Sequence, residues 1–274
     1  MNRIMINATN TLGQLQKQLD VISNNLANAD TNGFKSREAT FSDLLVQQFQ
    51  NQLHPNREMG RMTPEGIRLG TGAKLAQTKM NTKLGPIQTT GRSLDLALTN
   101  ENQYFKVLVQ ENGREEIRFT RNGAFYLSPV NGNQVMLVTA EGYPVLDEQN
   151  RPVQFNGQAG QNVTVDKTGR LSVGGGQAVN LGIVSVERPQ YLEQKGNNLL
   201  GLPADSTVAI GEVARDLTGA LRSEISVQQG ALEKSNVDIS KEMTDMINVQ
   251  RSYQFQSRSV TLGDQMMGLV NSLR

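Results

Sequence analysis

Hydrophobic side chains at the start of the chain recur in steps that alternate between four and three residues. They occupy Met1, Met5, Ala8, Leu12, Leu15, Leu19, Ile22 and Leu26. This repeat is typical of a coiled-coil seam rather than of the broader apolar stripe of a globular surface helix. It predicts a helix from Met1 to Leu26. Asn32-Gly33 then predicts a turn or a helix stop, because both residues tolerate positive φ.

A second helix is predicted at the other end of the chain, from Asp238 to Leu273. Its first turns carry Ile239, Met243, Met246 and Tyr253 at seam spacing. Beyond Phe255 two apolar stripes coexist, Val260, Met267 and Val270 on one side and Leu262, Met266, Leu269 and Leu273 on another. A helix that is apolar on two sides must contact more than one neighbour. We therefore expect the two terminal helices to pack as a coiled-coil layer, with each other or with neighbouring copies.

Three asparagines, Asn24, Asn25 and Asn28, lie near the end of the first helix although asparagine is a poor helix former. One interpretation is that the helix frays towards its stop signal. The other is that these amides form hydrogen bonds sideways to packed neighbours, where a charge would cost more free energy.

The segment 36–72 is expected to begin with a short helix within residues 36–53, with Ser42 as its N-cap. Residues 54–72 are rich in Gly and Pro and are interpreted as an extended connector. The single histidine of the chain, His54, precedes a proline there and is expected to be an exposed loop residue rather than a ligand or base.

From about residue 73 to 213 the pattern changes to short β runs separated by turn signals. Asn-Gly, a favoured hairpin dipeptide, occurs at 112–113, 122–123, 131–132 and 156–157. Strands are predicted at 94–98, 104–109, 116–121, 135–139, 163–166, 170–173 and 182–186. This describes an all-β, hairpin-rich domain. A polar linker is expected at 214–234 before the C-terminal assembly helix at 235–274, so the fold class is α+β.

The composition narrows the possible functions. With 27 basic and 26 acidic residues the formal net charge is +1, and no basic run offers the concentrated positive face that nucleic acid requires. There is no cysteine, no apolar run of the ~20 residues that a membrane helix needs, and no signal-peptide pattern. No nucleophile–base pair, phosphate loop or metal-ligand spacing is found, so we expect no enzyme activity, no cofactor and no metal.

Three stretches of sequence resemble the bacterial flagellar rod and hook proteins. The segment 19–35, LDVISNNLANADTNGFK, is similar to the N-terminal signature of that family. The segments SNVDI (235–239), EMTDMI (242–247) and QRSYQ (250–254) are similar to its C-terminal signature. GRSLDLAL (91–98) and FTRNGAF (119–125) resemble β-domain motifs of the family. The chain departs from the usual Gly-x-Gly-Phe-Phe strand start at 101–105, where it has ENQYF.

The resemblance is strongest to distal-rod-type proteins and implies a structural axial subunit. Such a subunit is exported through the flagellar type III apparatus without a cleaved signal peptide. It then packs helically with copies of itself and with neighbouring rod or hook proteins into a hollow, extracytoplasmic drive shaft of the basal body. The terminal helices would line the inner tube and the β domain would face outward, with no nucleic acid and no small-molecule substrate.

On this reading the assembly interface lies on the terminal helices. The residues expected in it are Met5, Leu12, Leu15, Leu19, Ile22, Asn24, Asn25, Leu26, Asn28, Ile239, Met243, Met246, Tyr253, Leu262, Met266, Leu269 and Leu273. Other classes of protein remain open from the residues alone. A coiled-coil adaptor or junction protein would form a discrete, closed oligomer. A β-rich binding module with helical stalks would carry a ligand patch on its β domain. A hydrolase is disfavoured, because no nucleophile–base pair is available.

Overall fold

The computed structural model describes residues 2–43, 47–49, 67–69, 73–111, 113–131, 134–156, 163–174, 177–196, 198–203 and 206–272. The chain forms two compact units, each built from segments that are far apart in the sequence. Unit 1 contains Met1–Leu26, Arg37–Lys79 and Ile239–Arg274, and unit 2 contains Ala27–Ser36 and Met80–Asp238.

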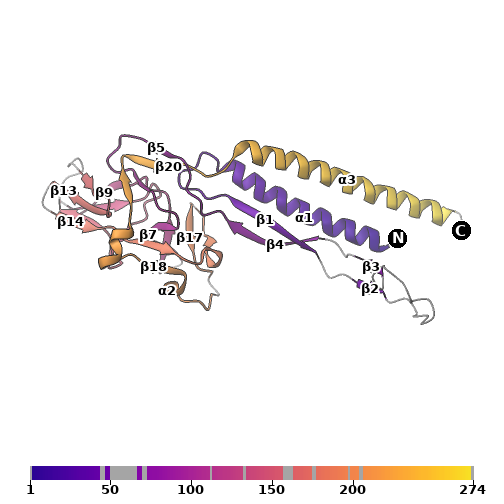
Figure 1. The fold of residues 1–274 in the computed structure, drawn as a ribbon, viewed down its shortest axis with the longest axis horizontal. Helices are drawn as coiled ribbons and strands as arrows, with labels where there is room; N and C mark the ends of the chain where they lie inside the picture. The colour runs from indigo at the N-terminus through magenta and orange to yellow at the C-terminus, as the bar shows by residue number, and fades with distance from the viewer. Residues whose placement is uncertain are drawn as a thin grey trace, which may run out of the picture. The chain divides into compact units, whose positions relative to one another are not determined.

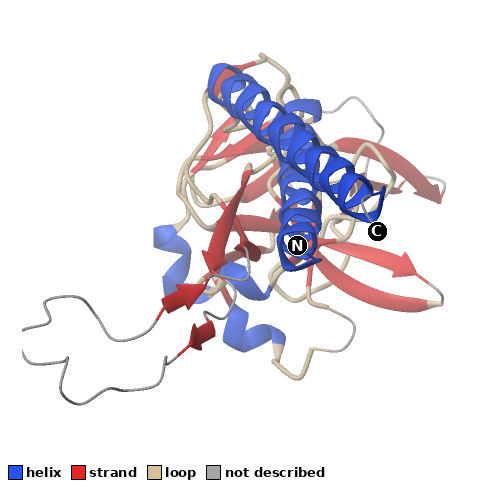
Figure 2. Ribbon diagram, turned by 90° about the vertical axis from the view of Figure 1, so that its right-hand side faces the viewer, coloured by secondary structure: helices blue, strands red, loops and turns tan. Residues whose placement is uncertain are grey.

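Two long helices dominate unit 1. Helix α1 runs from Asn2 to Ala27 and helix α3 from Ile239 to Ser272. They lie along each other with opposite chain directions (Figure 1 and Figure 2). Both terminal helices that the heptad pattern predicts are therefore present. The Asn32-Gly33 signal marks the end of a turn rather than the end of the helix, since α1 stops at Ala27 and Gly33 adopts φ +70°.

Unit 1 also contains two pairs of strands. Strand β1 (Arg37–Asp43) pairs with β4 (Ala73–Met80), and β2 (Gln47–Phe49) pairs antiparallel with β3 (Ile67–Leu69). The short helix expected within 36–53, with Ser42 as its N-cap, is wrong where the structure describes it, because Ser42 lies inside β1. A segment this short gains little from helix propensity, so pairing with a distant strand decides its structure. Residues 44–46 and 50–66, His54 among them, lie outside the described residues.

Unit 2 consists mainly of antiparallel strands (Figure 2). The strands are β5 (Ile87–Thr89), β6 (Leu96–Leu98), β7 (Gln103–Glu111), β8 (Arg114–Thr120), β9 (Tyr126–Asn131), β10 (Gln134–Val138), β11 (Gln154–Asn156), β12 (Val163–Val165), β13 (Arg170–Val173), β14 (Gln177–Asn180), β15 (Ile183–Val186), β16 (Glu193–Gln194), β17 (Leu199–Gly201), β18 (Ala214–Asp216), β19 (Val227–Gln229) and β20 (Ala231–Glu233). Three short helices complete it: η2 (Pro189–Tyr191), α2 (Ile210–Val213) and η3 (Gly219–Glu224).

The largest sheet of unit 2 has the strand order β16-β17-β8-β7-β15-β18. Its centre is the β7–β8 hairpin, in which Phe105 faces Thr120 and Glu111 faces Arg114 across the antiparallel pair. Two three-stranded sheets, β11-β10-β9 and β12-β13-β14, and the pairs β19-β6 and β20-β5 accompany it. Their buried side chains form two hydrophobic clusters. The larger includes Phe105 and Phe125, packed edge to face at a centroid distance of 5.1 Å, and the smaller includes Tyr104 and Phe119.

Most of the strands predicted for the middle of the chain are present within a residue or two, as at 170–173 and 183–186. The turn at Asn122-Gly123 is not a hairpin, since β8 pairs with β7 and β17. A Cβ on Gly123 would lie 1.7 Å from the Leu96 carbonyl oxygen, so glycine is needed there for a close backbone approach. Asn102, in the segment that departs from the family pattern, adopts φ +62° and forms a tight turn before β7.

The polar linker expected at 214–234 is also wrong. This segment forms β18, η3, β19 and β20, and it buries Leu217, Ile225 and Val227 in the core of unit 2. Each of its short strands pairs with a distant partner, as Gln228 in β19 does with Ala97 in β6. Pairing of this kind leaves little trace in the local pattern, because only three residues of each strand take part.

Candidate functional site

Two contacts fix how α1 and α3 run past each other. The Asn25 side-chain nitrogen, near the end of α1, donates to the Glu242 carboxylate in the first turn of α3 at 3.0 Å. At the other end of α1, a Cβ added to Gly263 would lie 3.7 Å from Met5 Cγ. The two helices are therefore in contact close to both ends of α1.

The residues expected in the assembly interface differ widely in burial. On α1, Ile22 and Asn25 are buried and Asn24 is exposed, while Met5, Leu12, Leu15, Leu19 and Leu26 are half-buried. Asn28, in the turn after α1, is also half-buried. On α3, Met246 and Tyr253 are half-buried and the others are exposed: Ile239, Met243, Leu262, Met266 and Leu269. Leu273 lies outside the described residues.

The less exposed positions of α3 recur in alternating steps of four and three, which places them on one face of the helix. They include Glu242, Met246, Val249, Tyr253, Gln256, Val260, Gly263 and Met267. This inner face contains the two residues that contact α1. The sequence assigned Ile239 and Met243 to the same seam as Met246, but the structure leaves both about half exposed.

A second set of apolar side chains on α3 remains open to solvent, and we call it the outer stripe. It consists of Ile239, Met243, Ile247, Phe255, Leu262, Met266 and Leu269. Phe255 is 72% exposed and Leu269 66%, although burying a side chain of this kind stabilises by roughly 1.5–3 kcal/mol. Large exposed apolar patches are characteristic of protein interaction sites.

Asn25 is the one of the three asparagines that is fully buried, with 1% of its surface exposed. Its side-chain nitrogen donates to the Arg37 carbonyl oxygen at 2.8 Å as well as to Glu242, and its side-chain oxygen accepts from the Arg37 N–H at 2.9 Å. The interpretation that the amides bond sideways to neighbours is confirmed for Asn25. Asn28 accepts a hydrogen bond from the Thr31 hydroxyl at 3.2 Å within the turn that follows α1.

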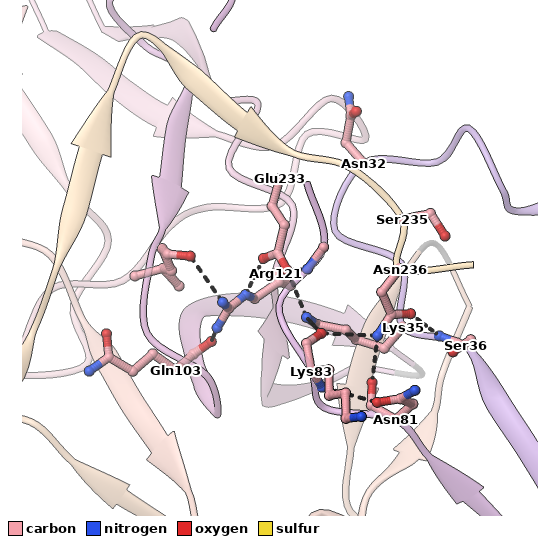
Figure 3. A network of polar contacts seen from close by, with 12 residues as sticks. Asn32, Lys35, Ser36, Asn81, Lys83, Gln103, Arg121, Glu233, Ser235 and Asn236 are labelled. Carbon is pink, nitrogen blue, oxygen red and sulfur yellow. Dashed lines mark hydrogen bonds and ion pairs between the residues drawn. The ribbon is translucent and has the colours of Figure 1, made fainter. Parts of the chain in front are cut away.

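Inside unit 2, the sequences that follow α1 and precede α3 meet in a buried ionic cluster (Figure 3). Glu233 is 2% exposed and takes two cations, Lys35 on one carboxylate oxygen at 2.7 Å and the Arg121 guanidinium on the other. The Gly85 N–H also donates to Glu233 at 2.8 Å. Burial lowers the pKa of Lys35, although Glu233 acts in the opposite direction.

Backbone contacts join the same two segments around this cluster. The Gly33 N–H donates to the Glu233 carbonyl oxygen at 2.8 Å, and the Ser36 N–H donates to the Asn236 side-chain oxygen at 2.7 Å (Figure 3). Glycine is needed at position 33 for two reasons. Its φ is positive, and a Cβ would lie 2.6 Å from the Arg121 backbone. The end of the N-terminal signature and the start of the C-terminal signature are thus joined in one contact network within unit 2.

Sequence reasoning missed Glu233, because it lies in the segment interpreted as a linker. One signal was available: a lysine ends the N-terminal signature and a glutamate stands two residues before the C-terminal one. Tyr104 was also missed. It is 1% exposed, and burial raises the pKa of its phenol to about 12. Within the described part of the chain its hydroxyl has no hydrogen-bond partner, although the Arg121 guanidinium lies 5.7 Å from the centre of its ring.

The residues that the structure describes form no group of three or more acidic, histidine or cysteine side chains able to hold a metal ion. None of the described helices combines the length and the apolar character of a membrane span. Among the described residues, α3 thus carries the exposed outer stripe, and unit 2 contains the buried ionic cluster around Glu233.

Comparisons with known proteins agree with these features. Three family models match the chain: the flagellar basal body rod FlgEFG protein C-terminal model at residues 228–273, the flagella basal body rod protein model at 5–35, and the flagellar hook protein FlgE/F/G D1 domain model at 100–173. The chain is 47% identical over 281 aligned positions to the flagellar hook-basal body complex protein FlhP of Bacillus subtilis, with 100% of both chains covered.

Flagellar basal-body rod proteins named FlgG are similar over nearly the same length. The identity is 34% to that of Buchnera aphidicola subsp. Schizaphis graminum, with 94% of each chain covered, and 32% to that of Bacillus subtilis, with 100% of each covered. The family models cover both terminal signatures and the β7–β8 region, where the contacts described above are concentrated. The chain belongs to the FlgE/F/G family of flagellar rod and hook proteins.

Proposed function

We propose that this protein is a structural axial subunit of the flagellar rod or hook-basal body, and that it assembles through α1 and α3. The observation that carries the proposal is the outer stripe of α3, whose large apolar side chains stay open to solvent while the opposite face of the same helix turns towards α1. The names of the relatives, which are rod and hook-basal body proteins, support the same role.

The inner face of α3 and the seam of α1 would form an antiparallel coiled coil. The residue numbers of the two contacting pairs, Asn25 with Glu242 and Met5 with Gly263, add to 267 and 268. If this relation holds along the whole pair, every seam position of α1 lies opposite an inner-face position of α3. Leu19 then faces Val249, and Ile22 faces Met246. The match of two independent repeats in one register supports the pairing.

The outer stripe would bind a second subunit. A patch on one copy that meets a different patch on the next gives a heterologous contact, which forms an open helical array when it does not close on itself. Helices with partly polar faces gain most of their stability from packing, so the terminal helices would become fully ordered on assembly. We further propose export by the flagellar type III apparatus and an extracytoplasmic position in the shaft, with its neighbours being copies of this chain and other rod or hook subunits.

The sharpest test changes the outer stripe without touching the rest of the fold. Leu262 is 61% exposed, so Leu262→Asp should leave the thermal unfolding of the purified chain unchanged. In cells whose own copy is deleted, this variant should abolish swimming and should be missing from isolated basal bodies. Ser257→Asp, at an exposed position of the same helix outside the stripe, is the matched control and should restore swimming. Normal motility with Leu262→Asp would refute the proposed role of the stripe.

Leu19→Asp tests the seam in the same way. We expect loss of assembly with unit 2 still folded, since Leu19 belongs to α1 and not to the core of unit 2. Incorporation of this variant into basal bodies at the normal level would argue strongly against a helical seam as the basis of assembly.

A further inference from the structure

A heptad seam does not by itself select one alignment of its two helices. When apolar residues repeat every seven positions on both helices, a slip of seven residues again places apolar side chains opposite each other. Such a slip would move α3 by about 10 Å along α1 at 1.5 Å per residue. The outer stripe would move with it, so a slipped subunit would offer the next subunit a displaced surface.

The packing between α1 and α3 near Asn25 is interrupted by a pocket. A cavity of about 200 Å³ lies between α1, β1 and α3, with Gln18, Glu38 and Asp245 among the side chains that line it. Close-packed side chains resist a shift because each fills a space shaped for it, and the pocket reduces that resistance locally. Directed hydrogen bonds between the helices can help to distinguish the alignments.

Asn25 supplies such a contact. Its side-chain nitrogen donates to the Arg37 carbonyl oxygen of β1 and to the Glu242 carboxylate of α3, and its side-chain oxygen accepts from the Arg37 N–H. It is one of four fully buried residues that the described parts of α1 and α3 contain, with Ala8, Ile22 and Val249, and it is the polar one among them. Because 1% of the surface of Asn25 is exposed, its amide has little access to water when a partner is lost.

We propose that Asn25 and Glu242 are positioning residues that select a single register of the α1–α3 pair. The inference rests on the proposed function, in which these helices form the assembling surface. In a pair slipped by one heptad, Glu242 would lie seven residues from Asn25, and the buried amide would lose this partner. The amide would keep its bonds to Arg37, but leaving one of its buried N–H groups without an acceptor disfavours an alignment that the apolar positions permit. A single buried asparagine is known to fix register in coiled coils in this manner.

The chain has no cysteine, so engineered pairs can report the register directly. Met5→Cys with Gly263→Cys reports the observed alignment, in which a Cβ at Gly263 would lie 3.7 Å from Met5 Cγ. Leu12→Cys with Gly263→Cys, and Met5→Cys with Gln256→Cys, report slips of one heptad in the two directions. Each pair is placed in the full-length purified chain, and intramolecular disulfide formation is followed under mild oxidation. The pairs are then combined with Asn25→Leu or Glu242→Leu.

In the parent chain the observed-register pair should cross-link at least about tenfold faster than either slipped pair, a preference of 1.4 kcal/mol. Asn25→Leu should bring the ratio towards one by raising a slipped cross-link, and Glu242→Leu should do the same from the other helix. Asn24→Leu, the same substitution at an exposed neighbouring side chain, should keep the parent ratio.

Three results would overturn the inference: an unchanged ratio in both leucine variants, a ratio near one already in the parent, or a decline of all cross-links together, which would mean that the helices separate rather than slip. The proposed function is judged separately by swimming and by the content of basal bodies. A selective register in a chain that is absent from basal bodies would refute the function alone.

Discussion

Unit 2 encloses its apolar residues, whereas unit 1 leaves many of them open. Phe105, Phe125 and Leu171 in unit 2 are each 1% exposed or less. In unit 1, the apolar residues of the outer stripe are about half exposed or more, and most positions of the α1 seam are half-buried. Both units belong to one chain and draw on the same residue types. Unit 2 therefore covers most of its apolar side chains within one chain, while the described part of α3 leaves the outer stripe exposed to solvent.

The two units also differ in the kind of polar group that they bury. Unit 2 buries full charges, with two cations around Glu233, which requires a rigid surrounding because a displaced partner would leave an unpaired charge. Unit 1 buries a neutral amide, Asn25, that forms hydrogen bonds to two other segments, β1 and α3. The buried ionic cluster suits a fold with a single rigid packing. The buried amide suits the proposed selection of one register of the α1–α3 pair.

Removing the central charge of unit 2 should have the largest effect. Glu233→Gln leaves Lys35 and Arg121 buried together without a carboxylate, so we expect the free energy of unfolding to fall by about 3–5 kcal/mol. Urea unfolding measures it. Adding Lys35→Met should recover part of the loss, because one of the two unpaired cations is then gone, and strictly additive effects would contradict this account. Glu141→Gln, at an exposed loop position, is the control and should change little.

The same substitution in the two units should have unequal effects. Leu171→Ala removes a fully buried side chain from unit 2 and should cost about 2–5 kcal/mol of unfolding free energy. Leu19→Ala, at a half-buried seam position, should cost clearly less in the free chain, because less surface is covered there before assembly. Thermal unfolding of the purified variants measures both. Equal losses would mean that the helix seam is already as tightly packed as the core of unit 2.

Tyr104→Phe should be close to neutral or should stabilise unit 2 by about 1 kcal/mol, because it removes a buried hydroxyl that has no partner among the described residues. The phenol itself can be followed by ultraviolet absorbance, and one tyrosine should ionise only near pH 12. That late-titrating signal should vanish in the variant. If all tyrosines of the wild-type chain titrate at their usual pKa, Tyr104 is more accessible to water than the fold indicates.

The smallest expected effect is a pH dependence of stability that involves Glu242, in the first turn of α3. Burial raises its pKa above 4.5, outweighing the hydrogen bond from Asn25, which lowers it. A folded-state pKa above the unfolded value means that the folded state binds more protons, so the contribution of Glu242 to stability is largest below pH 4.5 and declines as the pH rises through the folded pKa. The stability difference between the wild-type chain and Glu242→Gln should therefore drift in this direction over that window. A drift of opposite sign would place the carboxylate in a more polar environment.

The sequence predicts the parts of the fold that depend on neighbouring residues, such as a helix with a regular apolar repeat or a hairpin turn. The four-three pattern of α1 and the β7–β8 hairpin around Asn112-Gly113 are visible because neighbouring residues decide them. Strand β1 and the segment 214–234 are not, since their short strands are stabilised by partners far away in the chain. For the candidate site, the sideways bonding of Asn25 could be anticipated from a poor helix former inside a helix. Which carboxylate would meet Lys35 could not, because that depends on how two distant segments come together.

The two methionines of the outer stripe give the subunit a chemical vulnerability. Met243 is 50% exposed and Met266 61%, so the thioether sulfur atoms of a free chain are open to peroxide. Oxidation to the sulfoxide replaces a flexible apolar side chain by a polar one. A subunit exposed to oxidant before it joins the shaft would lose part of the surface it needs for joining, whereas contact with a neighbour would shield the same sulfur atoms. Subunits in the assembled shaft would then be oxidised more slowly than unassembled subunits.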